Sequence, residues 1–234
     1  PTRRSSDLAR LDALRATNKT LKPLYAALSV AIAVQVRLPN TYSLLPQWVL
    51  TATETTLLVT LVLGRYAHPR RQEPTVMRRL HMMTLTLVAV TTADNLTALG
   101  LLIRELLRGL DIDGRSLVLA ALGIWVTNVI VFALWFWELD GGGPIPRRAD
   151  PHASRDFLFP QDQGPDGPAK GGDGEPWMPD FIDYLYVSFT NSTAFSPTDT
   201  MPLSRWVKML MLVQSAAALL TIALIAARAV NILK

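Results

Sequence analysis

Twelve residues before the last apolar run of the chain hold side chains suited to contact an ion. This stretch, SFTNSTAFSPTD (188–199), has no Lys or Arg and one acidic residue, Asp199. Hydroxyl and carboxylate oxygens such as those of Thr193, Ser196, Thr198 and Asp199 can replace part of the hydration shell of a cation. The stretch therefore raises the question of whether it lines a path for ions.

A second set of polar side chains interrupts the apolar runs of the chain. Each member lies near the middle of such a run: Glu54, Asp94, Asn95, Asn128 and Gln214. Ionisable groups at the centre of a membrane are costly and normally face the interior of a helical bundle. The pattern indicates either a relay for protons or cations, or an interhelical hydrogen-bonded layer in which the acids are protonated.

Five apolar runs must position these side chains. Half of the 234 residues are hydrophobic and the mean hydropathy is positive, which is unusual for a soluble domain. A membrane span needs about 20 mostly apolar residues. The sequence therefore predicts an all-α integral membrane protein with five transmembrane helices, at 22–38, 44–64, 80–103, 116–138 and 206–232. The first is the weakest, because Gln35 and Arg37 interrupt its end.

A short helix is predicted just before the polar stretch. In PDFIDYLYV, Pro179 suits a helix entrance, Asp180 is a good N-cap and Asp183 lies in the first turn. The helix is too short to span a bilayer, which takes about 20 residues. The polar backbone that follows it cannot face lipid. We therefore expect a re-entrant, pore-type helix before the last span.

The chain divides into four parts on this reading. Residues 1–8 (PTRRSSDL) are expected to be an artefact, because part of a common sequencing adapter translates to them. Residues 9–139 form a four-helix transmembrane region, 140–179 a loop rich in Gly, Pro and Asp, and 180–234 the re-entrant loop with the last span. Five arginines in 65–79 favour the cytoplasm for that loop and for the 140–179 loop.

The acidic charge of the long loop before the short helix has two interpretations. Residues 140–183 hold nine acidic residues against four Lys or Arg. At the mouth of a pore, this charge would concentrate cations. Otherwise the segment is a solvated linker.

SFTNSTAFSPTDTMPLSRW resembles the pore loop and inner-helix entry of tetrameric potassium channels. Without gaps, Thr193 falls on the first threonine of the TTVGYG pattern and Asp199 on the aspartate after the filter. Pro202 and Trp206 fall on the proline and the aromatic residue that open the inner helix. The resemblance implies a homo-oligomer, with a tetramer favoured. A pore loop of the potassium-channel type would enter from the outside, whereas the arginines favour the cytoplasm, so both orientations stay open.

The filter itself departs from that family. Phe195, Ser196, Pro197 and Thr198 occupy the V-G-Y-G positions, so neither glycine is present. Glycine lets successive carbonyls point at the ion, and Pro197 fixes φ near −65°. A potassium-type stack of carbonyl cages is therefore not expected.

The whole chain also resembles an uncharacterised family of bacterial membrane proteins. The shared plan has four spans, an arginine-rich loop after the second, a polar loop and a last span. The matching residues here are YLYVSFT (184–190), Asp199 and AARAVNIL (226–233). This resemblance implies architecture, and a multi-pass location in the inner (plasma) membrane.

Several functional classes are disfavoured by the sequence. There is no cysteine, and His68, His81 and His152 show no metal-ligand spacing. No nucleophile with a nearby base and no cofactor fingerprint is found, so no enzyme, cofactor, metal site or nucleic-acid partner is expected.

The functional hypothesis that remains is a channel-like oligomer in the lipid bilayer that passes a monovalent cation. Its predicted pore-lining residues are Thr193, Phe195, Ser196, Pro197, Thr198 and Asp199. The alternatives are a non-conducting membrane scaffold or accessory subunit with a re-entrant plug, or a small proton- or cation-coupled transporter that uses Glu54 and Asp94.

Overall fold

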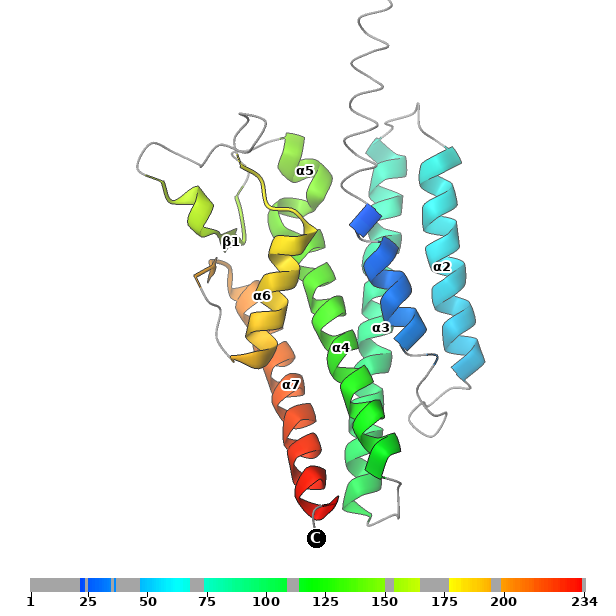
Figure 1. Cartoon of the computed structure of the whole chain (residues 1–234). Coiled ribbons are helices and arrows are strands. Elements are labelled where there is room, and N and C mark those ends of the chain that lie inside the picture. Colours follow the sequence, from blue (N-terminus) through cyan, green and yellow to red (C-terminus); the bar gives the residue numbers. More distant parts are fainter. Residues whose placement is uncertain are drawn as a thin grey trace, which may run out of the picture.

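The computed structural model describes residues 22–23, 25–34, 36, 47–67, 74–108, 114–149, 154–164, 177–194 and 199–232. These residues form mostly long helices lying side by side, with shorter elements gathered at one end (Figure 1). The helices are α2 (Gln47–Ala67), α3 (Pro74–Leu107), α4 (Gly114–Leu139), α5 (Pro144–Ala149), α6 (Phe181–Thr193) and α7 (Arg205–Ile232). The 3-10 turns are η2 (Asp140–Gly142) and η3 (Pro160–Asp162), and the strands are β1 (Phe157–Leu158) and β2 (Met201–Pro202).

Three described helices are long and apolar enough to cross a membrane: Arg78–Leu107, Gly114–Gly142 and Arg205–Ala227. They match three of the five predicted spans, and the helical class is confirmed. The second predicted span falls on α2, a helix of 21 residues that is not among these three. The first contains a shorter apolar helix, Tyr25–Val34, and parts of 22–38 lie outside the described residues. Five spans therefore remain a prediction.

Helix α4 is the centre of the bundle. It packs against α3, α6 and α7, whereas α2 packs on the far side of α3. An α-helix that is apolar around its whole circumference belongs in a protein interior or a membrane. The second half of α4 is buried around its circumference, because eleven of the residues from Thr127 to Glu138 are buried, most of them apolar. Its buried side chains therefore pack against α3 on one side and against α6 and α7 on the other.

The start of α3 and the end of α4 lie at the same end of the bundle. His81 Nδ1 lies 2.8 Å from Glu138 Oε2, and Glu138 is 1% exposed. The exposed Arg78 and Arg79 at the start of α3 therefore share this end with the chain after α4. The C-terminal end of α7 lies at the opposite end (Figure 1).

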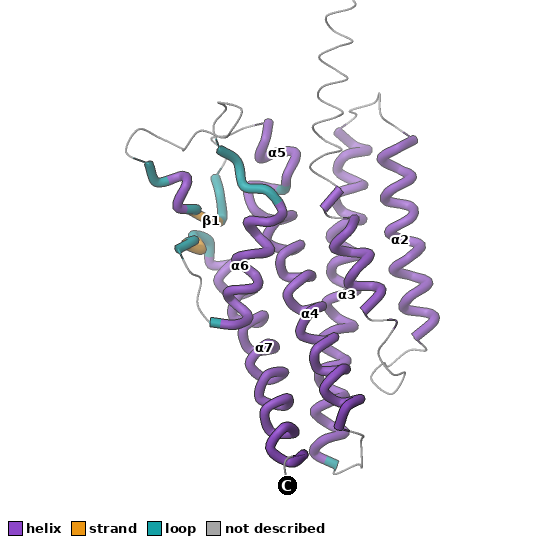
Figure 2. The backbone as a smooth tube through the Cα atoms, in the orientation of Figure 1, coloured by secondary structure: helices purple, strands orange, loops and turns teal. Residues whose placement is uncertain are grey.

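Three glycines turn the chain after α4. Gly141, Gly142 and Gly143 have φ of 59°, 78° and 106°, a backbone region that L side chains rarely adopt. The turn lets α5 fold back over the end of α4, so that Arg147 packs 3.5 Å from the position a Cβ would take on Gly141. We call the described residues 140–149 and 154–164 the cap; its strand β1 pairs with β2 as the small orange segments of Figure 2.

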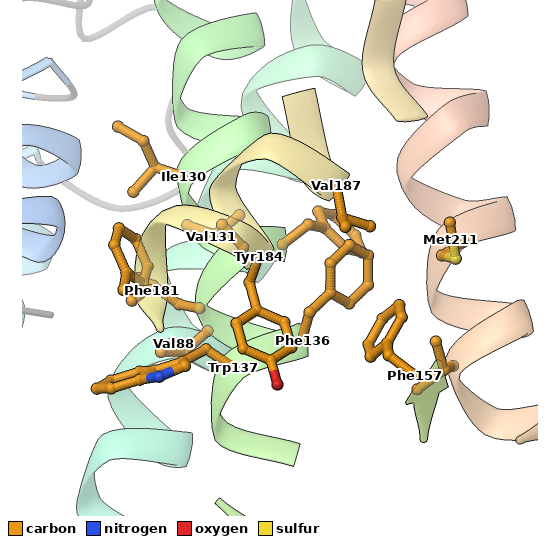
Figure 3. Close-up of a cluster of buried hydrophobic side chains, with 14 of the residues drawn as sticks. Val88, Ile130, Val131, Phe136, Trp137, Phe157, Phe181, Tyr184, Val187 and Met211 are labelled. Atoms are coloured by element: carbon orange, nitrogen blue, oxygen red, sulfur yellow. The ribbon is translucent and has the colours of Figure 1, made fainter. Parts of the chain in front are cut away.

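Aromatic side chains fill the space between the cap, α4 and α6 (Figure 3). Phe136 of α4 and Tyr184 of α6 both meet Phe157 of β1 edge to face, with ring centroids 5.3 and 5.8 Å apart. Trp137 meets Phe181 in the same way at 5.8 Å. Each such pair adds about 0.5–1.5 kcal/mol beyond area burial. The first half of α6 is therefore fixed by packing.

Candidate functional site

Helix α6 begins with a complete capping box. The Asp180 carboxylate accepts from the backbone N–H of Ile182 at 2.8 Å, and Asp183 Oδ2 accepts from the N–H of Asp180 at 2.7 Å. Burial raises the pKa of Asp183 above its usual range. The predicted N-cap is confirmed, and the helix has 13 residues, fewer than the about 20 of a span.

The polar face of α6 points into the protein. Ser188, Asn191 and Ser192 follow one another at spacings that share a helix face, and all three are buried. They meet Gln214 of α7, which is fully buried. Gln214 Nε2 donates to Ser188 Oγ at 2.6 Å and to Ser192 Oγ at 2.8 Å, and Gln214 Oε1 accepts from Asn191 Nδ2 at 2.8 Å.

Helix α4 and a neighbour of Gln214 extend this network. Ser188 Oγ donates to the carbonyl of Val129 at 2.6 Å, and Asn128 Nδ2 donates to the carbonyl of Gln214 at 3.3 Å. Ser215 Oγ donates to Asn191 Oδ1 at 3.1 Å. We call this set of side chains (Asn128, Ser188, Asn191, Ser192, Gln214 and Ser215) the amide seam. All are neutral, and they join α4, α6 and α7.

The amide seam lies about a third of the way along the last helix, at a depth comparable to half the thickness of a bilayer core. Helix α7 begins at Arg205, so Gln214 is about 14 Å further on at about 1.5 Å per residue. The hydrocarbon core of a bilayer is about 30 Å thick. Because Ser192 contacts Gln214 directly, the C-terminal end of α6 lies at this level of α7.

Two of the six predicted pore-lining residues fall within the described structure. Thr193 is the last residue of α6 and is exposed, with its hydroxyl donating to the carbonyl of Phe189 at 3.0 Å. Asp199 is also exposed. The other four, Phe195, Ser196, Pro197 and Thr198, lie outside the described residues. The prediction that these six residues line a pore is therefore not tested.

The chain returns to the cap after Asp199. Strand β2 pairs antiparallel with β1, with Met201 opposite Leu158 and Pro202 opposite Phe157. The backbone N–H of Leu203 donates to the carbonyl of Asp156 at 2.8 Å. Helices α6 and α7 therefore both begin beside the cap.

The predicted set of polar residues at membrane depth divides into two groups. Asn128 and Gln214 belong to the amide seam. Glu54 of α2 is 1% exposed, within hydrogen-bonding reach of Thr91 and close enough to Asp94 to sense its charge. Asn95 is buried and Asp94 is partly exposed on α3. The acids thus lie at the α2–α3 contact with Asn95 beside them on α3, whereas Asn128 and Gln214 lie at the contact of α4, α6 and α7.

Sequence reasoning missed the inward role of Ser188, Asn191 and Ser192. Their helical spacing is the available signal, but the polar composition of the whole stretch does not separate them from the residues that follow α6. No three His, Asp or Glu side chains converge as a metal-binding group within the described ranges.

The described residues form a helical bundle with three membrane-length helices, the cap, and the short helix α6, whose polar face is buried. No family model matches the chain, and neither does any curated protein or solved structure. The two family resemblances seen in the sequence therefore remain predictions.

Proposed function

We propose that the chain is a channel-like, multi-pass protein of a bacterial inner membrane, in which α6, the segment after it and α7 form a re-entrant unit. One observation carries the proposal. Helices α6 and α7 begin at the same end, yet α6 ends beside Gln214, about 14 Å along α7 at about 1.5 Å per residue. In a bilayer, chain that enters to half depth and returns needs protein or water around its free polar groups.

The exposed end of α6 supports a path for cations. The last carbonyls of a helix carry the negative end of its dipole, and Thr193 and Ala194 are exposed there. Asp199 adds a carboxylate on the exposed surface. Because this edge faces outward from a single chain, we propose that several copies, with four favoured, arrange it around a shared axis.

The proposed mechanism is weakly selective passage of a monovalent cation. Asp199 raises the local concentration of cations, and the oxygens of Thr193, Ser196 and Thr198 replace part of the hydration shell. Without the two filter glycines, the chain lacks the means for a stack of carbonyl cages. The cap adds less field than its sequence suggests, since Asp140 pairs with Arg147 and Asp162 with Arg155.

The amide seam favours a second candidate, a non-conducting scaffold in which α6 is a plug. Ser188, Asn191 and Ser192 are all satisfied within one chain, as a packed hairpin requires. Glu54, buried close to Asp94, favours a third, a transporter that carries protons or cations.

Cation flux into liposomes that contain the purified protein separates these candidates. We expect flux that Asp199→Asn reduces and that Asp162→Asn, an equal loss of charge within the cap, leaves unchanged. Flux abolished by Glu54→Gln alone would favour the transporter. Absence of flux from folded, oligomeric protein would overturn the channel and leave the plug.

A further inference from the structure

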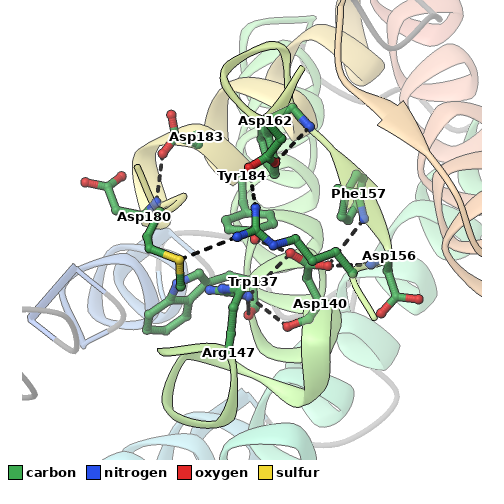
Figure 4. Close-up of polar contacts among 12 residues, drawn as sticks. Trp137, Asp140, Arg147, Asp156, Phe157, Asp162, Asp180, Asp183 and Tyr184 are labelled. Atoms are coloured by element: carbon green, nitrogen blue, oxygen red, sulfur yellow. Dashed lines mark hydrogen bonds and ion pairs between the residues drawn. The ribbon is translucent and has the colours of Figure 1, made fainter. Parts of the chain in front are cut away.

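Asp140 is tied through its side chain to three separate segments, the start of β1, α5 and α6 (Figure 4). It follows the last residue of α4 and is fully buried. Its Oδ1 accepts from the backbone N–H of Asp156 at 2.6 Å and of Phe157 at 3.3 Å. These two bonds fix the start of β1 on the end of α4.

The second carboxylate oxygen holds α6. The Tyr184 hydroxyl donates to Asp140 Oδ2. Burial raises the pKa of Tyr184 well above its usual range, so the hydroxyl stays protonated and remains a donor. Arg147 Nη1 lies 3.5 Å from the same oxygen, and its guanidinium sits 5.1 Å from the centre of the Tyr184 ring. The carboxylate, the guanidinium and the phenol thus form one buried group.

The same carboxylate reaches α7 through one further step. The β1 strand that it fixes pairs with β2, which ends three residues before α7. The described contacts of Asp140 therefore lead to the beginnings of both α6 and α7. The amide seam is made from different residues, deeper in the bundle, and it holds only the far end of α6.

We propose that Asp140 is a positioning residue through which the cap sets where α6 and α7 begin, and thereby how far the end of α6 is exposed. A hydrogen-bonded helix moves as a rod, so a shift at Tyr184 is carried about 14 Å to Thr193 at about 1.5 Å per residue. A role of this exposed end in ion passage rests on the proposed function. The effect of Asp140 on the position of α6 does not.

The absence of cysteine from the chain allows a direct test. Thr193→Cys reports on the end of α6. Arg108→Cys, exposed at the opposite end of the bundle, reports on the rest of the fold. The labelling rate of each cysteine by a small thiol reagent is measured in detergent-solubilised protein, alone and combined with Asp140→Asn, Tyr184→Phe or Asp162→Asn.

We expect Asp140→Asn and Tyr184→Phe to change the labelling rate at position 193 several-fold in the same direction. Position 108 should label at its original rate in every variant, and Asp162→Asn should change neither position. Asp162 is the matched acid, because its carboxylate pairs with Arg155 at 2.6 Å and accepts from the N–H of Phe159, both within the cap.

Tyr184→Phe decides the matter if Asp140→Asn fails to fold, because it removes one hydroxyl and keeps the Asp140–Arg147 pair. The proposal is wrong if Tyr184→Phe alters labelling at position 193 no more than Asp162→Asn does. It is also wrong if every variant changes positions 193 and 108 equally. Labelling that shifts in a protein without flux would support the positioning role and overturn the channel.

Discussion

The two ends of α6 are held by opposite chemistry. At the cap, Tyr184 meets a buried carboxylate and a buried guanidinium, from Asp140 and Arg147. At the amide seam, Asn191 and its neighbours meet Gln214, and no group is charged. A buried ion costs several kcal/mol unless it is paired, whereas an amide needs only hydrogen-bond partners. The difference indicates that α6 is held by charged groups at the end of the bundle and by neutral groups at depth.

The largest effect should follow from breaking the charged group. Asp140→Ala leaves Arg147, which is 2% exposed, without its counter-ion. Removing one partner of a buried ion pair typically costs about 3–5 kcal/mol. Denaturant unfolding in detergent measures the change in the free energy of unfolding.

A double variant sharpens that prediction. Replacing both partners, as in Asp140→Asn with Arg147→Met, removes the uncompensated charge and should recover a large part of the loss. A double variant as unstable as Asp140→Ala would show that the hydrogen bonds from Asp156, Phe157 and Tyr184, and not the ion pair, dominate this end of α6.

A smaller loss is expected at the amide seam. Gln214→Leu keeps the approximate volume but deprives Asn191, Ser188 and Ser192 of their partner. Interhelical hydrogen bonds in membrane proteins contribute about 0.6–2 kcal/mol, so we expect a loss of about 1–2 kcal/mol in the same unfolding assay. Thr221→Val is the matched control, because Thr221 is equally buried on α7 and its hydroxyl bonds only within its own helix, to Ala217. Equal losses for the two variants would contradict a seam between helices.

Substitution of the N-cap of α6 should reduce the free energy of unfolding less than the substitutions above. Asp180→Ala removes the acceptor for the N–H of Ile182, and the loss of such a cap costs about 0.5–2 kcal/mol. We expect about 1 kcal/mol, because Tyr184 and Phe181 still pack the first turns against the cap. Asp199→Ala is the comparison, since it removes an acid from the exposed surface outside any helix. A loss for Asp180→Ala no larger than for Asp199→Ala would show that the capping box is dispensable.

The sequence predicted local features far better than it predicted contacts between segments. Asp180 as the N-cap follows from residue type and position alone, and so do the apolar runs of α3, α4 and α7. The bond from Tyr184 to Asp140 crosses 44 residues, and the bond from Asn191 to Gln214 crosses 23. Such pairs depend on how helices pack, which hydropathy does not encode.

The cap is the clearest case of that limit. Its many Gly, Pro and Asp residues are typical of a solvated linker, yet its described parts hold buried side chains such as Phe157 and Arg147. The run DGGGP was the local signal, since consecutive glycines permit the turn that brings Arg147 back to Asp140. Nothing in the composition identifies the carboxylate at the start of that run as the point where three segments meet.

The ionisation of Tyr184 should have the smallest effect on the free energy of unfolding, because it does not occur at neutral pH. Its pKa is raised in the folded protein, mainly by burial, so the folded state keeps a proton that an unfolded chain releases near pH 10. Its contribution to stability is therefore complete below about pH 10 and is lost as the pH rises further. The ultraviolet titration of folded protein should be the same for Tyr184→Phe as for the original chain up to about pH 10, because Tyr184 does not ionise there. A difference between the two curves near the ordinary tyrosine pKa would mean that water reaches the hydroxyl, and that the charged end of α6 is held less tightly than the neutral seam.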